Sequence, residues 1–308
     1  MYKFRFIQKR NLWYLISSTF IISAIIMSVF RLSQSLPVFN LGVDFTGGHS
    51  LMLGFENFKS SVQNSIKNKV NLDQKFTVDL RSAILNYGID KFSIQITKDS
   101  DVIIKTLKLE NNEHTKLVEF MKNQFGDISI LEIDYIGPSI GEELRTMSLW
   151  IVLLVSLFLL IYTSIRFEFS YGLSAIFALI HDLLVVLSFA ILFNIEVNTV
   201  FIAALLTILG YSINDTIVVF DRIRENFEIK PEAFPVDVVN LSLNQTFSRT
   251  MHTSITTILV VLSLLIFGGV TIQTFCIVLL VGLIAGTYSS LCIASPFLVG
   301  LLMRSYNE

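Results

Sequence analysis

Charged residues are scarce in this sequence, and their scarcity limits the class of protein it can encode. Only 16% of the 308 residues are Asp, Glu, Lys or Arg, while 53% are hydrophobic. An ordinary soluble domain carries about 25% charged residues. The mean hydropathy of +0.65 is correspondingly high. Such a composition is typical of a multi-pass membrane protein.

Several sequence signals of function are also missing. The net charge of −2 offers no basic surface to a nucleic acid, so we expect no nucleic-acid partner. The chain has no glycine-rich nucleotide loop that could supply energy. Its four histidines lack the spacing of metal ligands, so we expect no metal and no other cofactor. It has no Ser-His or paired-Asp motif of an intramembrane protease, so we do not expect an enzyme.

Long uncharged runs are present instead, and each is long enough to cross a bilayer, which takes about 20 apolar residues. No Asp, Glu, Lys or Arg occurs between Arg249 and Arg304, enough sequence for two spans with a turn at Gly268-Gly269. The six predicted spans cover residues 11–31, 146–166, 170–193, 197–220, 249–268 and 271–303.

Basic residues near the span ends predict the orientation. They gather on the side of the N-terminus, whereas the short loops near Glu196 and Gly269 have none. Because basic loops stay inside, we expect both termini in the cytoplasm. The segments predicted to be cytoplasmic are residues 1–10, residues 304–308 and a linker at 221–248 that carries a short amphipathic helix after Pro235.

Residues 37–142 are more polar, and their periodicity predicts an α+β domain inserted after the first span. Strands are expected at 48–55, 92–97, 102–109 and from Ile128 to Ile133, and helices at 76–87 and 113–125. This βαββαβ order indicates a ferredoxin-like extracytoplasmic domain. Residues 57–74 are rich in Ser, Asn, Lys and Gln, which predicts a loose insertion.

An acidic residue, Asp215, lies within the fourth predicted span. A carboxylate at the centre of a membrane helix costs about 2.5 to 3.5 kcal/mol, so it usually has a task or a partner. Arg249 begins the next span from the same side, and we expect the two side chains to meet. Their pairing would couple the proton affinity of the aspartate to the position of the arginine. A static ion pair that fixes helix register is the alternative.

Other residues are candidates for supporting roles. His181 and Asp182 lie halfway along the third span; they are either members of a proton relay or a histidine satisfied by a neighbouring helix. Ser212, Asn214 and Thr253 are further candidates for relay or support. Small residues at helical spacing predict close helix packing in the last span, at Gly282, Gly286 and Ser290. Candidate hinges, or else ordinary turns, border the α+β domain at Gly42, Gly47, Gly48, Gly137 and Pro138.

Five segments together closely resemble the SecF family of bacterial protein-export membrane proteins. They are GVDFTGG (42–48), IGPSIGEELR (136–145), GYSINDTIVVFDRIREN (210–226), LNQTFSRTMHTSITT (243–257) and GTYSSLCIASP (286–296). The resemblance follows the same order over almost the whole chain. Val43 stands where the family commonly has isoleucine.

The resemblance implies a membrane all-α six-helix bundle, one half of an RND-like transporter, in the bacterial inner membrane. It implies a SecD-like partner, the SecYEG translocon with YajC and YidC, and preprotein substrates. Protons would be the coupling ion, with Asp215 matching the family's proton-linked carboxylate and Arg249 its arginine partner. Two alternatives remain: a structural scaffold for the translocon without proton coupling, and an RND-like small-molecule exporter.

Overall fold

The computed structural model describes residues 4–64, 69–89, 92–97, 99–106 and 113–307. The chain forms two compact units: Met1–Asn40 with Ser148–Glu308, and Leu41–Met147. The first contains η1 (Ile7–Lys9), α1 (Arg10–Ser33), α7 (Phe169–Leu192), β6 (Glu196–Val197), α8 (Thr199–Ile229), α9 (Pro235–Phe267), α10 (Val270–Ser289), the π-helical turn η3 (Ser290–Ala294) and α11 (Ser295–Asn307). β1 (Asn40–Leu41) and α6 (Pro138–Arg166) each begin in one unit and end in the other.

Within the described residues, six helical segments are long and apolar enough to cross a membrane, as the uncharged runs predict. They are α1 with η1, α6, α7, α8, α9, and the joined α10, η3 and α11. Helix α10 packs against α7, α8 and α9, and the segment it begins is the most buried of the six, whereas α1 and α6 are the most exposed. A helix that is apolar on all sides is expected at such a central place.

The predicted linker at 221–248 is largely helical. Helix α8 continues to Ile229, and α9 begins at Pro235 and runs without a break to Phe267, so the predicted amphipathic helix and fifth span are one helix. Ion pairs between side chains one turn apart stabilise this charged end of α8. In one of them, Arg222 Nη1 lies 2.6 Å from Glu225 Oε2. Hydropathy indicates where a helix leaves the apolar core of a membrane, but it does not indicate where the helix itself ends.

The second and last spans also differ from their predicted limits. Helix α6 starts at Pro138, well before residue 146, because proline suits the first turn of a helix. The last span is interrupted by η3 directly before Pro296. Because proline has no N–H to donate, the helix widens there, and the Ser295 hydroxyl donates to the Ser290 carbonyl at 2.9 Å.

The second unit is an α+β domain. Its elements are α2 (Val43–Thr46), β2 (Gly48–Phe55), α3 (Glu56–Asn64), α4 (Lys69–Tyr87), β3 (Phe92–Ile96), β4 (Asp101–Thr106), α5 (Glu113–Phe125) and β5 (Ile128–Ile136). The strands form one antiparallel sheet in the order β3-β4-β2-β5. The central β2 buries Leu51, Leu53 and Phe55 completely. Residues 107–109 of the third predicted strand lie outside the described residues.

The predicted loose insertion at 57–74 is wrong where the structure describes it. Helix α3 covers Glu56–Asn64, and α4 already begins at Lys69. The composition is polar, but Phe58 and Val62 are each only 7% exposed. These two apolar residues, four apart, give α3 a buried face, which is sufficient for a short helix on a sheet.

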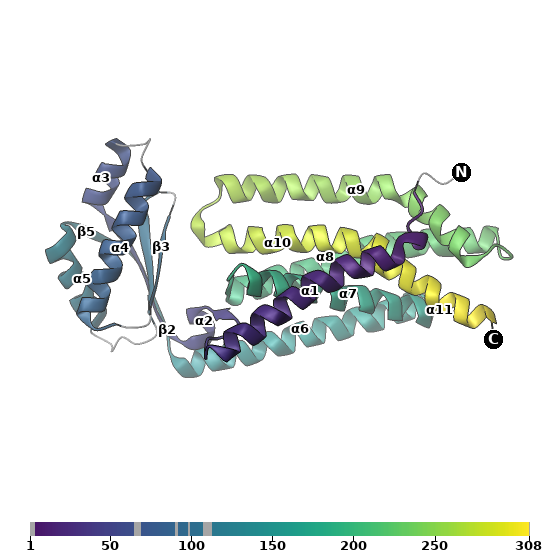
Figure 1. The fold of residues 1–308 in the computed structure, drawn as a ribbon, viewed down its shortest axis with the longest axis horizontal. Coiled ribbons are helices and arrows are strands. Elements are labelled where there is room, and N and C mark those ends of the chain that lie inside the picture. The colour runs from purple at the N-terminus through teal and green to yellow at the C-terminus, as the bar shows by residue number, and fades with distance from the viewer. Residues whose placement is uncertain (1–3, 65–68, 90–91, 98, 107–112, 308) are drawn as a thin grey trace. The chain divides into compact units, whose positions relative to one another are not determined.

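The N-terminal segment is fastened to the start of α9. The Phe4 N–H donates to Asn244 Oδ1 at 3.0 Å, and Asn244 Nδ2 donates back to the Phe4 carbonyl at 2.8 Å. The Ile7 N–H donates to Asn240 Oδ1 at 3.3 Å, and the ring of Phe4 lies 5.4 Å from that of Phe247. Within the bundle, α1 begins and α11 ends where α8 and α9 are joined (Figure 1).

The two ends of the α+β domain cross closely at Gly47. Its φ of +71° is left-handed, and a Cβ there would lie 2.8 Å from Pro138 Cα. From the other side, a Cβ on Gly141 would lie 2.8 Å from the Gly47 nitrogen. The candidate hinge residues Gly47 and Pro138 are therefore packed against each other, and Gly48, with φ +137°, follows directly.

We expect Gly47→Ala to destabilise the α+β domain by more than its backbone conformation alone would cost. The combination of a positive φ with ψ 162° is adopted almost only by glycine and costs another residue about 1 to 3 kcal/mol, and contact with the Pro138 backbone adds to it. Gly88→Ala is a matched control, since Gly88 has φ +100° but no atom of the described residues lies within 4 Å of its Cβ position. Hydrogen exchange of β2 measures the difference; equal effects of the two variants would contradict the close crossing.

Candidate functional site

Asp215 lies on α8 and is only 3% exposed. The Ser254 hydroxyl, from α9, lies 3.4 Å from its Oδ2 in donor position. Ser254 also lies 2.7 Å from the hydroxyl of Thr287 on α10. The carboxyl group is thus placed where three helices meet, with hydroxyl groups as its hydrogen-bonding neighbours. Within the part of the chain that the structure describes, no cation is directly bonded to this carboxyl group, so a charge on it would be costly.

Arg249 does not form the predicted direct ion pair with Asp215. Its side chain is exposed on α9, although it is close enough to act on the charge of Asp215. The α8–α9 register explains the separation: Tyr211 Oη lies 2.8 Å from the Thr257 hydroxyl, and Arg222 Nε donates to Gln245 at 2.7 Å. Interpolation between these antiparallel pairs places Arg249 about one helical turn, or about 5 Å, from Asp215 along α8.

A second buried carboxylate, Asp182, is more extensively bonded than Asp215. It is completely buried and accepts hydrogen bonds at Oδ2 from Ser212 of α8 at 2.5 Å and Ser289 of α10 at 2.8 Å. Its Oδ1 lies 3.0 Å from His181 Nδ1, and His181 Nε2 lies 2.8 Å from the Ser17 hydroxyl of α1. This cluster therefore joins four helices.

The small residues of the last span lie against α8. A Cβ on Gly286 would lie 2.9 Å from Ser212 Cβ, and Gly282 lies directly against Ile208. One turn further, the Ser290 and Thr216 hydroxyls are 3.0 Å apart. The stripe Gly282, Gly286 and Ser290 thus meets the stripe Ile208, Ser212 and Thr216 in register, which allows close approach of the two backbones.

The remaining candidates differ in their position. Asn214 is exposed on α8. Thr253 is exposed as well, but its side chain is within hydrogen-bonding reach of the Asp215 carboxyl group. Its hydroxyl also donates to carbonyls of its own helix, while its carbonyl accepts from Tyr211 Oη at 2.9 Å. Among the other candidate hinges, Gly42 precedes α2 in an extended conformation. A Cβ on Gly137 would meet only the Tyr135 hydroxyl, at 3.9 Å.

Sequence reasoning missed the hydroxyls that face the two carboxylates. Ser17, Ser254, Thr287 and Ser289 all lie in apolar spans, and a buried hydroxyl in a membrane helix is a weak signal because it can bond to its own backbone. Thr250 is also buried, and its hydroxyl has no partner among the described residues. Those residues contain no group of three His, Cys, Asp or Glu side chains that could hold a metal ion.

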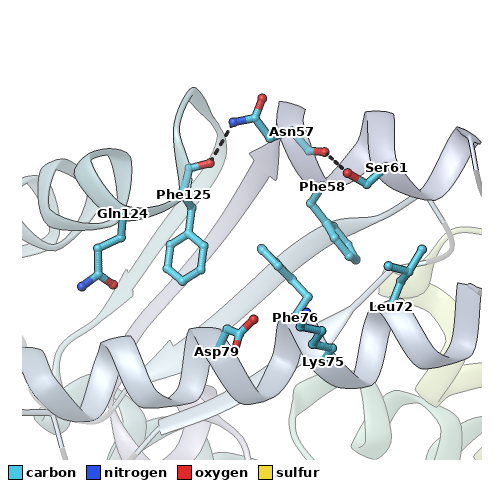
Figure 2. A pocket seen from close by; sticks show the side chains of 9 residues that line it. All are labelled: Asn57, Phe58, Ser61, Leu72, Lys75, Phe76, Asp79, Gln124 and Phe125. Atoms are coloured by element: carbon cyan, nitrogen blue, oxygen red, sulfur yellow. Dashed lines mark hydrogen bonds between the residues drawn. The ribbon is translucent and has the colours of Figure 1, made fainter.

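The α+β domain has an open pocket of about 310 Å³. Figure 2 shows Phe58 of α3 and Phe76 of α4 facing each other in it, with Phe125 at the end of α5; the first two rings are stacked, with centroids 4.0 Å apart. Polar groups form the rim, where Asn57 Nδ2 donates to the Phe125 carbonyl at 3.2 Å. The walls are therefore aromatic and the rim polar.

Comparison with known proteins gives one family. Residues 116–304 match the family profile described as "Protein export membrane protein SecD/SecF, C-terminal". A protein translocase subunit SecF from Sebaldella termitidis is 41% identical over 303 residues, covering 97% of this chain and 92% of the relative. That of Haemophilus influenzae is 37% identical over 278 residues, covering 89% and 81%.

Solved structures agree with the sequence relatives. A crystal structure of SecDF, a translocon-associated membrane protein from Thermus thermophilus, superposes with a TM-score of 0.76 at 29% identity. SecDF in a super-membrane-facing form gives 0.68 at 30% identity. Each match covers 99% of this chain and 39% of the SecDF chain, so the chain spans about two fifths of those structures.

Proposed function

The chain belongs to the SecD/SecF family of protein-export membrane proteins, and from this premise we propose that it is a subunit of a protein translocase. In this role it assists the export of preproteins across the bacterial inner membrane. The proton-motive force supplies the energy through Asp215 and Arg249. The observation that carries the proposal is Asp215, a carboxylate buried in a membrane helix with hydroxyl neighbours and, among the described residues, no directly bonded cation.

The site can exist in two charge states. When protonated, Asp215 is neutral, and a hydroxyl such as that of Ser254 satisfies it. When the proton leaves, the carboxylate needs a counter-charge, because an unpaired charge in low dielectric is costly. Arg249 lies about one turn away along the helix pair and is the cation placed to provide it. Proton release therefore draws α9 and α8 into a different register.

This motion can be transmitted through the bundle, because α8 is closely packed on α10 through Gly282 and Gly286. Each proton that crosses the membrane supplies about 2.3 kcal/mol per 100 mV. The α+β domain responds as one body in this proposal, which is supported by the close packing of Gly47 against Pro138 where the two ends of the domain meet. Its strand order β3-β4-β2-β5 supports a ferredoxin-like domain.

The topology and partners follow from the same premise. We place both termini and the α8–α9 connection in the cytoplasm, because they share one end of the bundle (Figure 1), and Arg166, Arg222 and Arg224 belong to the helix ends near it. The longer SecDF relatives support a SecD-like partner subunit. SecYEG, YajC and YidC are proposed on the family resemblance.

Export driven by an imposed proton gradient tests the function. Vesicles containing the assembled complex and a preprotein should show faster export with the gradient, and Asp215→Asn should abolish that acceleration. The scaffold alternative predicts that Asp215→Asn loses assembly together with export. Complex recovery after solubilisation separates the two outcomes.

We expect Arg249→Lys to reduce the gradient-driven acceleration of export several-fold without abolishing it. Lysine keeps the positive charge but lacks the planar five-donor fork that can bind a carboxylate in two places. Arg249→Gln, which removes the charge, should behave like Asp215→Asn. An Arg249→Gln complex with wild-type acceleration would show that the arginine is not part of the proton site.

The exporter alternative has one observation in its favour, the aromatic pocket of the α+β domain (Figure 2). Its volume of about 310 Å³ is at the lower end of the range of about 300 to 1,000 Å³ for small-molecule sites. If it bound a solute for export, Phe76→Ala would remove solute-dependent proton uptake. Under our proposal it leaves gradient-driven preprotein export unchanged once the domain is folded.

A further inference from the structure

We propose that His181 and Asp182 form a second proton-binding site of the bundle, which holds one exchangeable proton between two side chains. The link of this site to export rests on the proposed function. The proton site itself rests only on the hydrogen bonds around the two residues, which lie on α7, away from the α8–α9 contact where Asp215 and Arg249 lie.

The direction of each hydrogen bond around His181 can be assigned in turn, starting from the Tyr288 hydroxyl. The Tyr288 hydroxyl donates its proton to the Trp13 backbone carbonyl at 2.7 Å, and a carbonyl can only accept. The Tyr288 oxygen is therefore an acceptor for Ser17, whose hydroxyl donates to it at 3.3 Å. Ser17 has a single hydroxyl proton, so at 2.8 Å from His181 Nε2 its oxygen must accept. The imidazole must then carry a proton on Nε2.

The hydrogen bond at Nδ1, on the other side of the His181 imidazole ring, accounts for the second proton. His181 Nδ1 lies 3.0 Å from Asp182 Oδ1, so one further proton lies between them, on the nitrogen or on the oxygen. Either way the pair is neutral overall, as an imidazolium with a carboxylate or as an imidazole with a carboxylic acid. Neutrality is favoured in a completely buried site, and Asp182 is 0% exposed. All the hydrogen bonds described above for this cluster are satisfied together in this state.

Release of the proton has a defined structural effect. One proton passes from His181 Nε2 to water, and the remaining proton stays on Nδ1 facing Asp182, which is then a carboxylate. The bare Nε2 becomes an acceptor, so the Ser17 hydroxyl turns to donate to it and gives up Tyr288. The Ser17–Tyr288 hydrogen bond between α1 and α10 is thereby broken, while the Tyr288–Trp13 bond between the same two helices and the Ser17–His181 bond between α1 and α7 are kept. Proton uptake reverses each step.

Of the two residues of the pair, His181 lines cavities and Asp182 does not, so in this proposal the proton is exchanged through His181. Two cavities, of about 400 and 280 Å³, are both lined by Ser17 and His181, whereas Asp182 lines neither. The other titratable groups near the pair are Tyr14 and Tyr288, which line one cavity each. Cys292 of η3 is buried close to Tyr288, and α8 contributes Asp215, one turn beyond Ser212.

The same pair is connected to the Asp215 helix. Ser212, three residues before Asp215, donates to Asp182 Oδ2, and Ser289 of α10 donates to the same oxygen. Thr216, which follows Asp215, donates to the Ser212 carbonyl at 3.1 Å. A change of charge on Asp182 therefore alters its hydrogen bond with Ser212, which holds α8 in place close to Asp215. Two proton sites on adjacent helices are in this way joined through one serine.

Nitrogen-15 NMR of histidine-labelled protein in lipid tests the proposal, since the chain has only four histidines. His181→Gln assigns the His181 signals. We expect a directly bonded proton on His181 Nε2 in the wild type, and in Ser17→Ala, where the acceptor is gone, a fall of the Nε2-protonated fraction to below about half. Ser18→Ala is the matched control, because Ser18 is the exposed neighbour of Ser17, and it should match the wild type.

Tyr288→Phe is a second, independent variant, since it removes the oxygen to which Ser17 donates. It should shift His181 towards the Nδ1–H form in the same way as Ser17→Ala. A bare Nε2 in the wild type from about pH 5 to pH 8, or spectra of both variants equal to the wild type, would overturn the proposal. Neither result would affect export by Asp215, whose own test is the loss of gradient-driven acceleration in Asp215→Asn.

Discussion

Replacing Asp215 by asparagine should remove the acceleration of export by a proton gradient completely, and leave the complex assembled. Asparagine has nearly the shape of the protonated carboxyl group, so the hydroxyl of Ser254 still finds an acceptor at its side-chain oxygen. It cannot lose a proton, so the bundle is held in the state that corresponds to protonated Asp215. Export in the absence of a gradient should proceed at the wild-type rate.

Two further variants sharpen this result. Asp215→Glu retains a titratable carboxyl group and should keep part of the acceleration, with a reduction caused by the longer side chain in a packed site. Asn214→Asp places a carboxyl group on the exposed neighbouring position, and in the Asp215→Asn background it should not restore acceleration. Full acceleration in Asp215→Asn alone would contradict proton coupling at this residue.

Gly286→Leu should separate α8 from α10 and lower the stability of the whole bundle. Even a Cβ at this position would lie 2.9 Å from Ser212 Cβ, and overpacking of this kind costs about 1 to 3 kcal/mol. Displacing Ser212 also removes a hydrogen bond from the buried Asp182, which costs about 1 to 3 kcal/mol more. The thermal unfolding midpoint of the purified protein measures the combined loss.

Gly300→Leu provides the comparison, because Gly300 is exposed on the adjoining α11 and no described residue has an atom within 4 Å of its Cβ position. It should unfold at the wild-type temperature. Gly286→Ala should be intermediate, since a single methyl group displaces Ser212 less than a leucine side chain does. A Gly286→Leu protein as stable as Gly300→Leu would mean that α8 and α10 are not in close contact.

The number of spans could be predicted from the sequence because charge is excluded from the bilayer core. The strand 48–55 and the helix 113–125 could be predicted with the observed bounds, since each has a clear period and a glycine at its edge. Helix α3 could not, because only Phe58 and Val62 carry its apolar signal. Helix ends beyond the apolar layer were also missed, as in α6 and α9.

The carboxylates could be found from the sequence, but their partners could not. Asp215 and Asp182 stand out because charge in an apolar run is rare. Whether Arg249 or Ser254 faces Asp215 depends on the rotation and shift of α9 against α8, and a shift of one turn changes the answer. Ser17, Ser212 and Ser289 come from three helices far apart in the chain, and nothing local in the sequence connects Ser17 to His181, or Ser212 and Ser289 to Asp182.

The fastening of the N-terminal segment to α9 also constrains how the molecule is made. Phe4 and Asn244 are 240 residues apart in the chain, so the backbone groups of Phe4 and Ile7 must wait for their amide partners while the intervening spans and the α+β domain are synthesised. At about 5 to 20 residues per second, this wait lasts about 10 to 50 s. The first helix is therefore inserted into the membrane early but forms these hydrogen bonds late. The bundle can close only after the fifth span has emerged from the ribosome.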